Sequence, residues 1–269
     1  MSDFRNRCNS GRLRLSISPC PNDTFMFDAM LNGRIDTEGL SFDVEYHDIE
    51  ELNRGVLSAE PDVSKISCAV LPAITHNYRL LSSGAALGRG NGPLLVRRRG
   101  ETGDIACIAV PGEYTTANAL IGRLFPSIRE RVPMLFSEIA AAVERGEFDA
   151  GVLIHEGRFV YERRNLELVA DLGVEWERQT ALPLPLGGIV MRRDLPQDLL
   201  ECVERVLRRS IEFAFANPLL SREYVKQHAQ ELEDEVIEKH ISLFVNDYSL
   251  NLGKEGLLAI EQLTGLSEV

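Results

Sequence analysis

The sequence predicts an α/β protein, because short apolar runs that suit buried strands alternate with stretches of helical periodicity. A second observation is the change of character after residues 187–192, beyond which the chain is nearly all amphipathic helix. A third is size: 269 residues with 44% hydrophobic content suffice for one large domain or two smaller ones. From this pattern we expect a mostly parallel sheet.

Strands are expected where short apolar or β-branched runs lie between turn signals. Alternation at Phe42, Val44 and Tyr46 is typical of a half-buried strand, whereas the apolar run from Ser64 could pass directly into a helix. In order, the expected strands are 13–18, 40–46, 64–71, 80–87, 94–97, 105–110, 132–136, 148–154, 166–171 and 187–192.

Helices fit between these strands and fill the last third of the chain. An Asn/Asp cap precedes the stretch that ends at Asn32, and Ser137-Glu138 is a typical helix start. The expected helices are 22–32, 49–57, 115–125, 137–145, 196–215, 219–228, 233–244 and 253–264, with a loop at 246–252.

Two organisations fit this order of elements. One is a single open sheet. The other is a pair of lobes, in which the chain crosses out near Leu94 and returns near Gly188. Short strand-like segments at both crossings favour the second, and a cleft between lobes suits a ligand that must be enclosed. One lobe would then hold residues 1–95 and 187–269, and the inserted lobe residues 96–186.

The charge and the cysteines narrow the class of protein. A net charge of −12 argues against binding to nucleic acid and to anionic membrane surfaces. No apolar run approaches the roughly 18 residues that a membrane span needs. Five scattered cysteines form no disulfide framework, and the polar segment Met1–Arg14 has no apolar signal core. We therefore expect a cytoplasmic protein; the oligomeric state stays open.

One histidine is delivered to a strand end. Residues 151–154 form a short apolar run, and His155 comes where that strand should end. Carboxyl ends of parallel strands face the ligand crevice, and an imidazole titrates near working pH. His155 is therefore a candidate general base, although a structural hydrogen bond is the commoner role for such a position. The other four histidines lack metal-like spacing, so no metal site is expected.

Two strand-to-helix turns are suited to an anion. Residues 18–24 place two prolines around Cys20, ahead of a helix that Asn22, Asp23 or Thr24 could cap. Residues 111–117 again open a helix, where the hydroxyls and amides of Thr115 and Thr116 could hold a carboxylate. Ordinary rigid turns are the alternative for both. The glycine-rich segment 82–93 either approaches a ligand or connects the lobes.

Four motifs occur in order: Ser18-Pro-Cys-Pro-Asn-Asp-Thr24, Lys65-Ile-Ser67, Pro111-Gly-x-x-Thr-Thr-Ala117 and Ile154-His-Glu-Gly157. Together they resemble the 1,4-dihydroxy-6-naphthoate synthase family of the futalosine route to menaquinone. The resemblance runs from about Leu13 to Arg192. It implies a two-lobed, periplasmic-binding-protein-like fold (type II) with a central ligand cleft.

The resemblance also implies an activity. Family members are lyases that convert cyclic dehypoxanthinyl futalosine to 1,4-dihydroxy-6-naphthoate and release a dihydroxyacetone-type fragment, without metal or redox cofactor. His155 matches the family's proton acceptor. The remaining matched positions are the substrate-contacting Lys65, Ile66, Ser67, Thr116 and Ala117, and Ser18, Asn22 and Asp23, whose roles are less defined. The alternative is a non-catalytic protein that binds or senses a small carboxylate.

Overall fold

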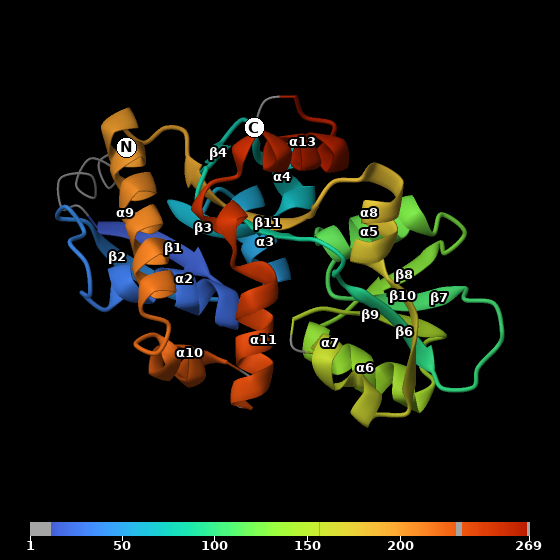
Figure 1. The fold of residues 1–269 in the computed structure, drawn as a ribbon. Helices are drawn as coiled ribbons and strands as arrows, with labels where there is room; N and C mark the ends of the chain where they lie inside the picture. Colours follow the sequence, from blue (N-terminus) through green and yellow to red (C-terminus); the bar gives the residue numbers. More distant parts are fainter. Residues whose placement is uncertain (1–11, 156, 230–232, 268–269) are drawn as a thin grey trace.

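Two separate β-sheets form the centres of two lobes that lie side by side (Figure 1). The computed structural model describes residues 12–155, 157–229 and 233–267. Glu156, next to the candidate base, therefore lies outside the described residues. Within them, no helix combines the length and the apolar composition that crossing a bilayer requires.

Lobe 1 is built on a sheet with the strand order β2-β1-β3-β11-β4, to which β5 adds by pairing with β11. β1 runs parallel to β2 and β3, whereas β11 runs antiparallel to β3, β4 and β5. The strands are β1 (Arg12–Ile17), β2 (Ser41–Tyr46), β3 (Val63–Ser67), β4 (Tyr78–Leu80), β5 (Ala86–Gly88) and β11 (Leu184–Arg192).

Helices cover both faces of this sheet. On one face α2 (Pro21–Leu31) is buried along nearly its whole length, because it packs against α9, α10 and α11 as well as the sheet. On the other face Val56, Ile66, Val190 and Ile260 share a core. The helices of lobe 1 are α2, α3 (Ile49–Leu57), α4 (Leu71–Ile74), α9 (Gln197–Ala216), α10 (Arg222–His228), α11 (Asp234–Phe244), α12 (Asp247–Leu250) and α13 (Gly253–Thr264), with the 3₁₀ turn η1 (Cys68–Val70).

Lobe 2 has the strand order β10-β6-β9-β7-β8. β7 runs parallel to β8 and β9, and β6 runs antiparallel to β9 and β10. The fully buried Trp176 anchors the core on one face, and Ile139 and Val143 on the other. The elements are β6 (Leu94–Arg98), β7 (Cys107–Val110), α5 (Thr116–Leu124), β8 (Glu130–Pro133), α6 (Phe136–Arg145), β9 (Ala150–Leu153), α7 (Gly157–Val160), η2 (Tyr161–Arg163), β10 (Leu166–Asp171) and α8 (Leu172–Thr180).

The chain passes from lobe 1 to lobe 2 between β5 and β6, and it returns through β11. At this crossing Gly92 and Gly173 pack backbone to backbone: a Cβ at Gly92 would lie 2.5 Å from the amide nitrogen of Gly173. The amide of Leu172 donates to Pro93 O nearby, at 2.9 Å. The lobe boundaries expected at 95/96 and 186/187 stay a prediction.

The expectation of a mostly parallel sheet is wrong, because both sheets are mixed. β6 and β11 carry the chain between lobes, so no crossover helix forces them parallel to their neighbours. The single strand expected at 80–87 is two short strands, β4 and β5, interrupted at Gly84, whose φ is 86°. Residues 246–252 contain the short helix α12, and α8 was not expected at all.

Candidate functional site

A cavity that is partly open to solvent lies between the two lobes. Every candidate residue from the sequence except Asp23 lines it. Lobe 1 contributes Ser18, Cys20, Asn22, Ile49, Lys65, Ile66, Ser67, Ala86, His240 and Phe244; lobe 2 contributes Thr115, Thr116, Ala117, Ile154, His155 and Arg158; the crossings contribute Gly92, Pro93, Leu186 and Gly187.

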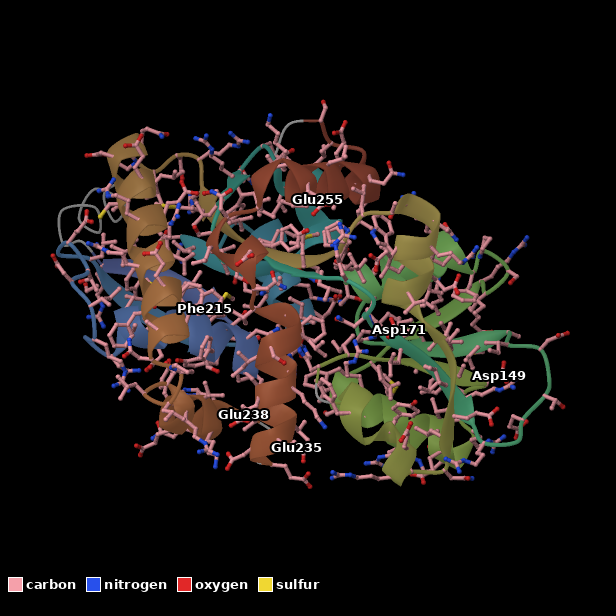
Figure 2. The ribbon with its side chains drawn as sticks, in the orientation of Figure 1. Asp149, Asp171, Phe215, Glu235, Glu238 and Glu255 are labelled. Atoms are coloured by element: carbon pink, nitrogen blue, oxygen red, sulfur yellow. The ribbon has the colours of Figure 1, made fainter. Side chains whose placement is uncertain are left out.

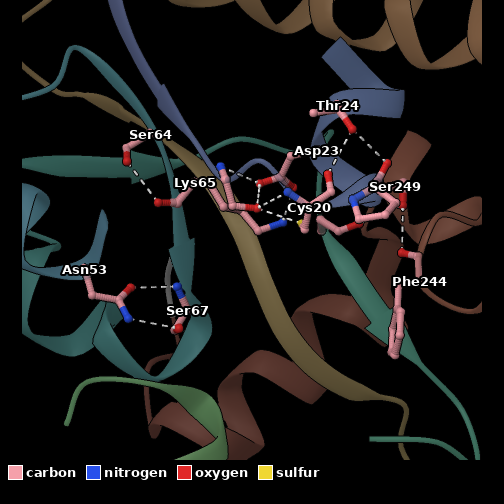
Figure 3. Close-up of polar contacts among 12 residues, drawn as sticks. Cys20, Asp23, Thr24, Asn53, Ser64, Lys65, Ser67, Phe244 and Ser249 are labelled. Carbon is pink, nitrogen blue, oxygen red and sulfur yellow. Dashed lines mark hydrogen bonds and ion pairs between the residues drawn. The ribbon is translucent and has the colours of Figure 1, made fainter. Parts of the chain in front are cut away.

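Asp23 lies directly behind the cavity wall and pairs with Lys65 (Figure 3). Its carboxylate accepts a hydrogen bond from Lys65 Nζ at 2.9 Å and from the amide and hydroxyl of Ser18 at 3.1 and 3.0 Å. Burial alone lowers the pKa of Lys65, but the adjacent Asp23 carboxylate helps to reverse this and leaves the pKa raised. Lys65 is therefore a charged donor whose position is fixed by a buried partner.

Cys20, between the two prolines, is a poor nucleophile in this setting. Burial, and then the neighbouring Asp23 carboxylate, raises the pKa of the Cys20 thiol to about 12. The thiol is therefore protonated at neutral pH, and thiolate chemistry at the cavity is not favoured.

Ser67 is oriented by Asn53, a residue that sequence reasoning missed. The Asn53 side chain donates to Ser67 Oγ at 3.0 Å and accepts from the Ser67 amide at 2.8 Å (Figure 3). It also donates to Tyr114 O in lobe 2, at 3.3 Å. The one feature that could have identified Asn53 is its position: it is a polar residue at a buried position of the amphipathic helix α3, and buried polar groups are usually hydrogen-bonded.

The two threonine hydroxyls at the start of α5 are used within the protein. Thr115 Oγ1 donates to Gly112 O at 3.0 Å and caps α5 by accepting from the amide of Asn118 at 3.2 Å. Thr116 Oγ1 donates to Leu186 O at 2.8 Å and accepts from the amide of Ala69 at 3.3 Å. A ligand carboxylate is therefore left with the first amides of the helix, which have no partner within it.

His155 follows β9 in an unusual backbone conformation. Its φ is 51°, in the left-handed region that non-glycine residues adopt infrequently. The ring lies edge-on to Phe136 at a centroid distance of 5.0 Å and stacks on His240 of lobe 1 at 6.0 Å. The turn thus directs the imidazole across the cleft rather than along the strand, and such strained positions concentrate at functional sites.

Arg158 and His240 were not predicted as site residues. Arg158 donates to Gly92 O at 2.8 Å and to Asp171 Oδ2 at 3.0 Å, so its guanidinium is held at the lobe crossing. Burial raises the pKa of Asp171 although Arg158 opposes this. The sequence gives no motif for either residue. His240 in addition is far from the other site residues in the chain.

Two buried polar atoms at the cavity wall have no hydrogen-bond partner among the described residues: Asn22 Oδ1 and His240 Nδ1. Buried polar groups are usually paired, and exceptions at a cavity often mark where a ligand or water completes the bonding. Both atoms belong to lobe 1, on α2 and α11, and both line the same space as His155.

The fold and this cavity define a periplasmic-binding-protein-like α/β protein with a cavity between its two lobes. Solved structures with little sequence similarity share the fold. The ligand-binding component of an ABC-type import system from Staphylococcus aureus is 13% identical, with a TM-score of 0.71 over 94% of this chain and 90% of that one. A Candida albicans protein described as having the generic periplasmic binding protein fold is 13% identical, with a TM-score of 0.69 over 96% and 92%.

The chain belongs to the menaquinone biosynthesis family, whose family model matches residues 13–268. The 1,4-dihydroxy-6-naphthoate synthases of Thermus thermophilus and Streptomyces coelicolor are each 42% identical to it, over 95% and 93% of this chain and 94% and 91% of their own. A crystal structure of an Archaeoglobus fulgidus protein is 39% identical, with a TM-score of 0.90 over 94% of this chain and 96% of that one. The family resemblance inferred from the four motifs is confirmed.

Proposed function

We propose that this enzyme of menaquinone biosynthesis is a 1,4-dihydroxy-6-naphthoate synthase that acts on cyclic dehypoxanthinyl futalosine, with His155 as the general base. The observation that carries the proposal is the meeting of His155 from lobe 2 with the Lys65–Ser67 segment of lobe 1 in one interlobe cavity. The names of the two curated relatives support the same activity.

The proposed reaction needs a base and a site that holds the substrate in one pose. His155 removes a proton from a carbon or a hydroxyl of the substrate, and the electron pair of the broken bond stays on the substrate. Formation of the aromatic ring then drives out the dihydroxyacetone-type fragment, so the reaction is of the lyase type. Closure of the lobes excludes water and fixes the base against the substrate.

In this proposal, residues of both lobes bind the carboxylated substrate. The amides of Thr116 and Ala117 at the start of α5 suit a carboxylate, because they carry the positive end of the helix dipole. Lys65, oriented by Asp23, supplies a charged donor from the opposite wall. Ser67 and Asn22 offer polar contacts from lobe 1, and Ser18 orders the Asp23 carboxylate behind them.

Incubation of the purified protein with cyclic dehypoxanthinyl futalosine tests the proposal. We expect 1,4-dihydroxy-6-naphthoate, identified by chromatography and by its absorbance, at a rate that scales with protein concentration. Recovery of unchanged ligand from a protein that binds it would instead identify a non-catalytic binding protein on the same fold.

A further inference from the structure

His240 occupies a place in the cavity that packing alone does not explain. It lies on α11 and is buried, with an exposed fraction of 1%. Glu235 and Glu238 of the same helix are exposed to solvent (Figure 2). The His240 ring lies 5.3 Å from the Phe244 ring and 6.1 Å from the Phe159 ring, measured between centroids. A phenyl group would fill such an apolar setting without leaving a buried nitrogen unpaired, whereas His240 Nδ1 has no partner among the described residues.

The second observation is the relation of His240 to the candidate base. The rings of His240 and His155 come from opposite lobes and are nearly parallel, with an interplanar angle of 15° and centroids 6.0 Å apart. Both residues line the cavity. A substrate that reaches the imidazole of His155 therefore also passes within reach of His240.

The ring of His240 is uncharged at neutral pH. Burial, and then the electrostatic influence of the neighbouring His155, Arg158 and Lys65, lowers the pKa of His240 well below its ordinary 6.5. A neutral imidazole carries one N–H donor and one acceptor nitrogen. It can therefore hold a substrate oxygen without competing with His155 for the proton that the reaction releases.

We propose that His240 is a catalytic residue that hydrogen-bonds, through Nδ1–H, to the substrate oxygen that gains negative charge when His155 removes a proton. The proton passes from the substrate to the His155 ring, the electron pair of the broken bond moves onto the substrate, and His240 stabilises the resulting charge without transferring its own proton. This inference rests on the proposed function. Because His155 and His240 come from opposite lobes, the catalytic site is complete only when the two lobes are together.

Three substitutions in the full chain test this assignment. H240N places an amide near the position of Nδ1, H240Q places it near Nε2, and H240F keeps a ring but no polar atom. With cyclic dehypoxanthinyl futalosine as substrate, we expect H240F and H240Q to lose on the order of 10²-fold in kcat, as for removal of one oxyanion donor. H240N should keep at least about a tenth of the wild-type kcat. H76N, at an exposed histidine outside the cavity, is the matched control and should be unchanged.

A purely structural role for His240 gives the opposite order, with H240F the most active and most stable variant. Thermal unfolding of each variant shows which of them fold. If H240F does not fold, the comparison of H240N with H240Q decides, and equal rates in these two overturn the assignment. If the wild-type protein itself forms no naphthoate, the proposed function fails. If the wild-type protein is active and H240F is equally active, the role given to His240 is refuted and the proposed function stands.

Discussion

At the scale of single residues, the site depends on side chains whose hydrogen bonds are fixed within the protein. Lys65 is held by Asp23, Ser67 by Asn53, and the hydroxyl of Thr116 by Leu186 O. His155 reaches the cleft because its backbone turns into the left-handed region directly after β9. The positions and charges of these side chains are thus set before a substrate enters, as electrostatic catalysis requires.

Replacement of His155 by Asn tests the base directly. Asn tolerates the left-handed conformation that residue 155 adopts, so H155N should fold with an unchanged melting temperature. It cannot accept the proton, and we expect kcat to fall by about 10²–10⁴-fold. Steady-state rates by product chromatography provide the measurement, and a kcat close to that of the wild type would remove His155 from the mechanism.

The buried pair of Lys65 and Asp23 leads to a prediction on stability. K65M leaves the fully buried Asp23 carboxylate uncompensated, and D23N does the same to the Lys65 ammonium. Each single change should cost about 3–5 kcal/mol in the free energy of unfolding. The double variant D23L/K65M should cost less than either, since no unpaired charge remains. Urea denaturation of the three variants checks this, and additive losses would contradict it.

At the scale of elements, the start of α5 joins the lobes. Thr116 Oγ1 bonds both Leu186 O on β11 and the amide of Ala69 in η1. Thr115 keeps its hydroxyl for the cap of the helix. The amides that we assign to the substrate carboxylate are therefore positioned by contacts with the opposite lobe.

T116V should raise KM more than it lowers kcat. Valine removes both hydrogen bonds of the hydroxyl and leaves their buried partners unpaired, a loss of about 1–3 kcal/mol that falls on the closed, substrate-binding form. T116S keeps the hydroxyl and should stay close to wild-type kinetics. A fall in kcat alone, with KM unchanged, would show that Thr116 is not part of ground-state binding.

The sequence predicted individual elements better than their pairing. Runs such as 40–46 and 105–110 are recognisable because side-chain burial alternates or persists locally. The mixed strand directions were not predictable, because they depend on where the chain leaves one sheet and joins another. Helix α8 was missed because its few apolar residues, among them Trp176, lie between charged ones.

The same distinction holds for the site. Thr116 could be named from the sequence because it stands at a helix start, and Lys65 because it matches a motif of the family that the chain resembles. Asn53, Arg158 and His240 could not be named, because each acquires its place through contacts between segments far apart in the chain. The prediction that the hydroxyls and amides of Thr115 and Thr116 hold a carboxylate stays a prediction, although the two hydroxyls donate to Gly112 O and Leu186 O within the protein.

At the scale of the whole molecule, two contacts across the cleft differ in their surroundings. The half-buried Glu50 of lobe 1 accepts a hydrogen bond from the amide of Tyr114 in lobe 2 at 3.0 Å. The exposed ion pair of Arg163 with Glu233 also joins the lobes, with nitrogen–oxygen distances of 2.7 and 2.8 Å. Solvent screens the exposed pair, so Glu50 should contribute more to closure.

E50A should therefore raise KM about tenfold, the loss expected for one hydrogen bond to a charged group. E233A, which removes the exposed ion pair, should raise KM by at most about fivefold. Small-angle scattering of the ligand-free variants should show a larger radius of gyration for E50A than for E233A. An effect of E233A that equals or exceeds that of E50A would reverse this ranking.

The back-to-back packing of Gly92 and Gly173 limits how this protein can evolve. A methyl group at either position would overlap the main chain of the other, so no compensating change of side chain can relieve it. A saturation library screened for folded, active protein should lose alanine and all larger residues at both positions, although Gly173 does not line the cavity. New substrate specificities would then have to arise from changes in the cavity walls, with the joint between the lobes inherited unaltered.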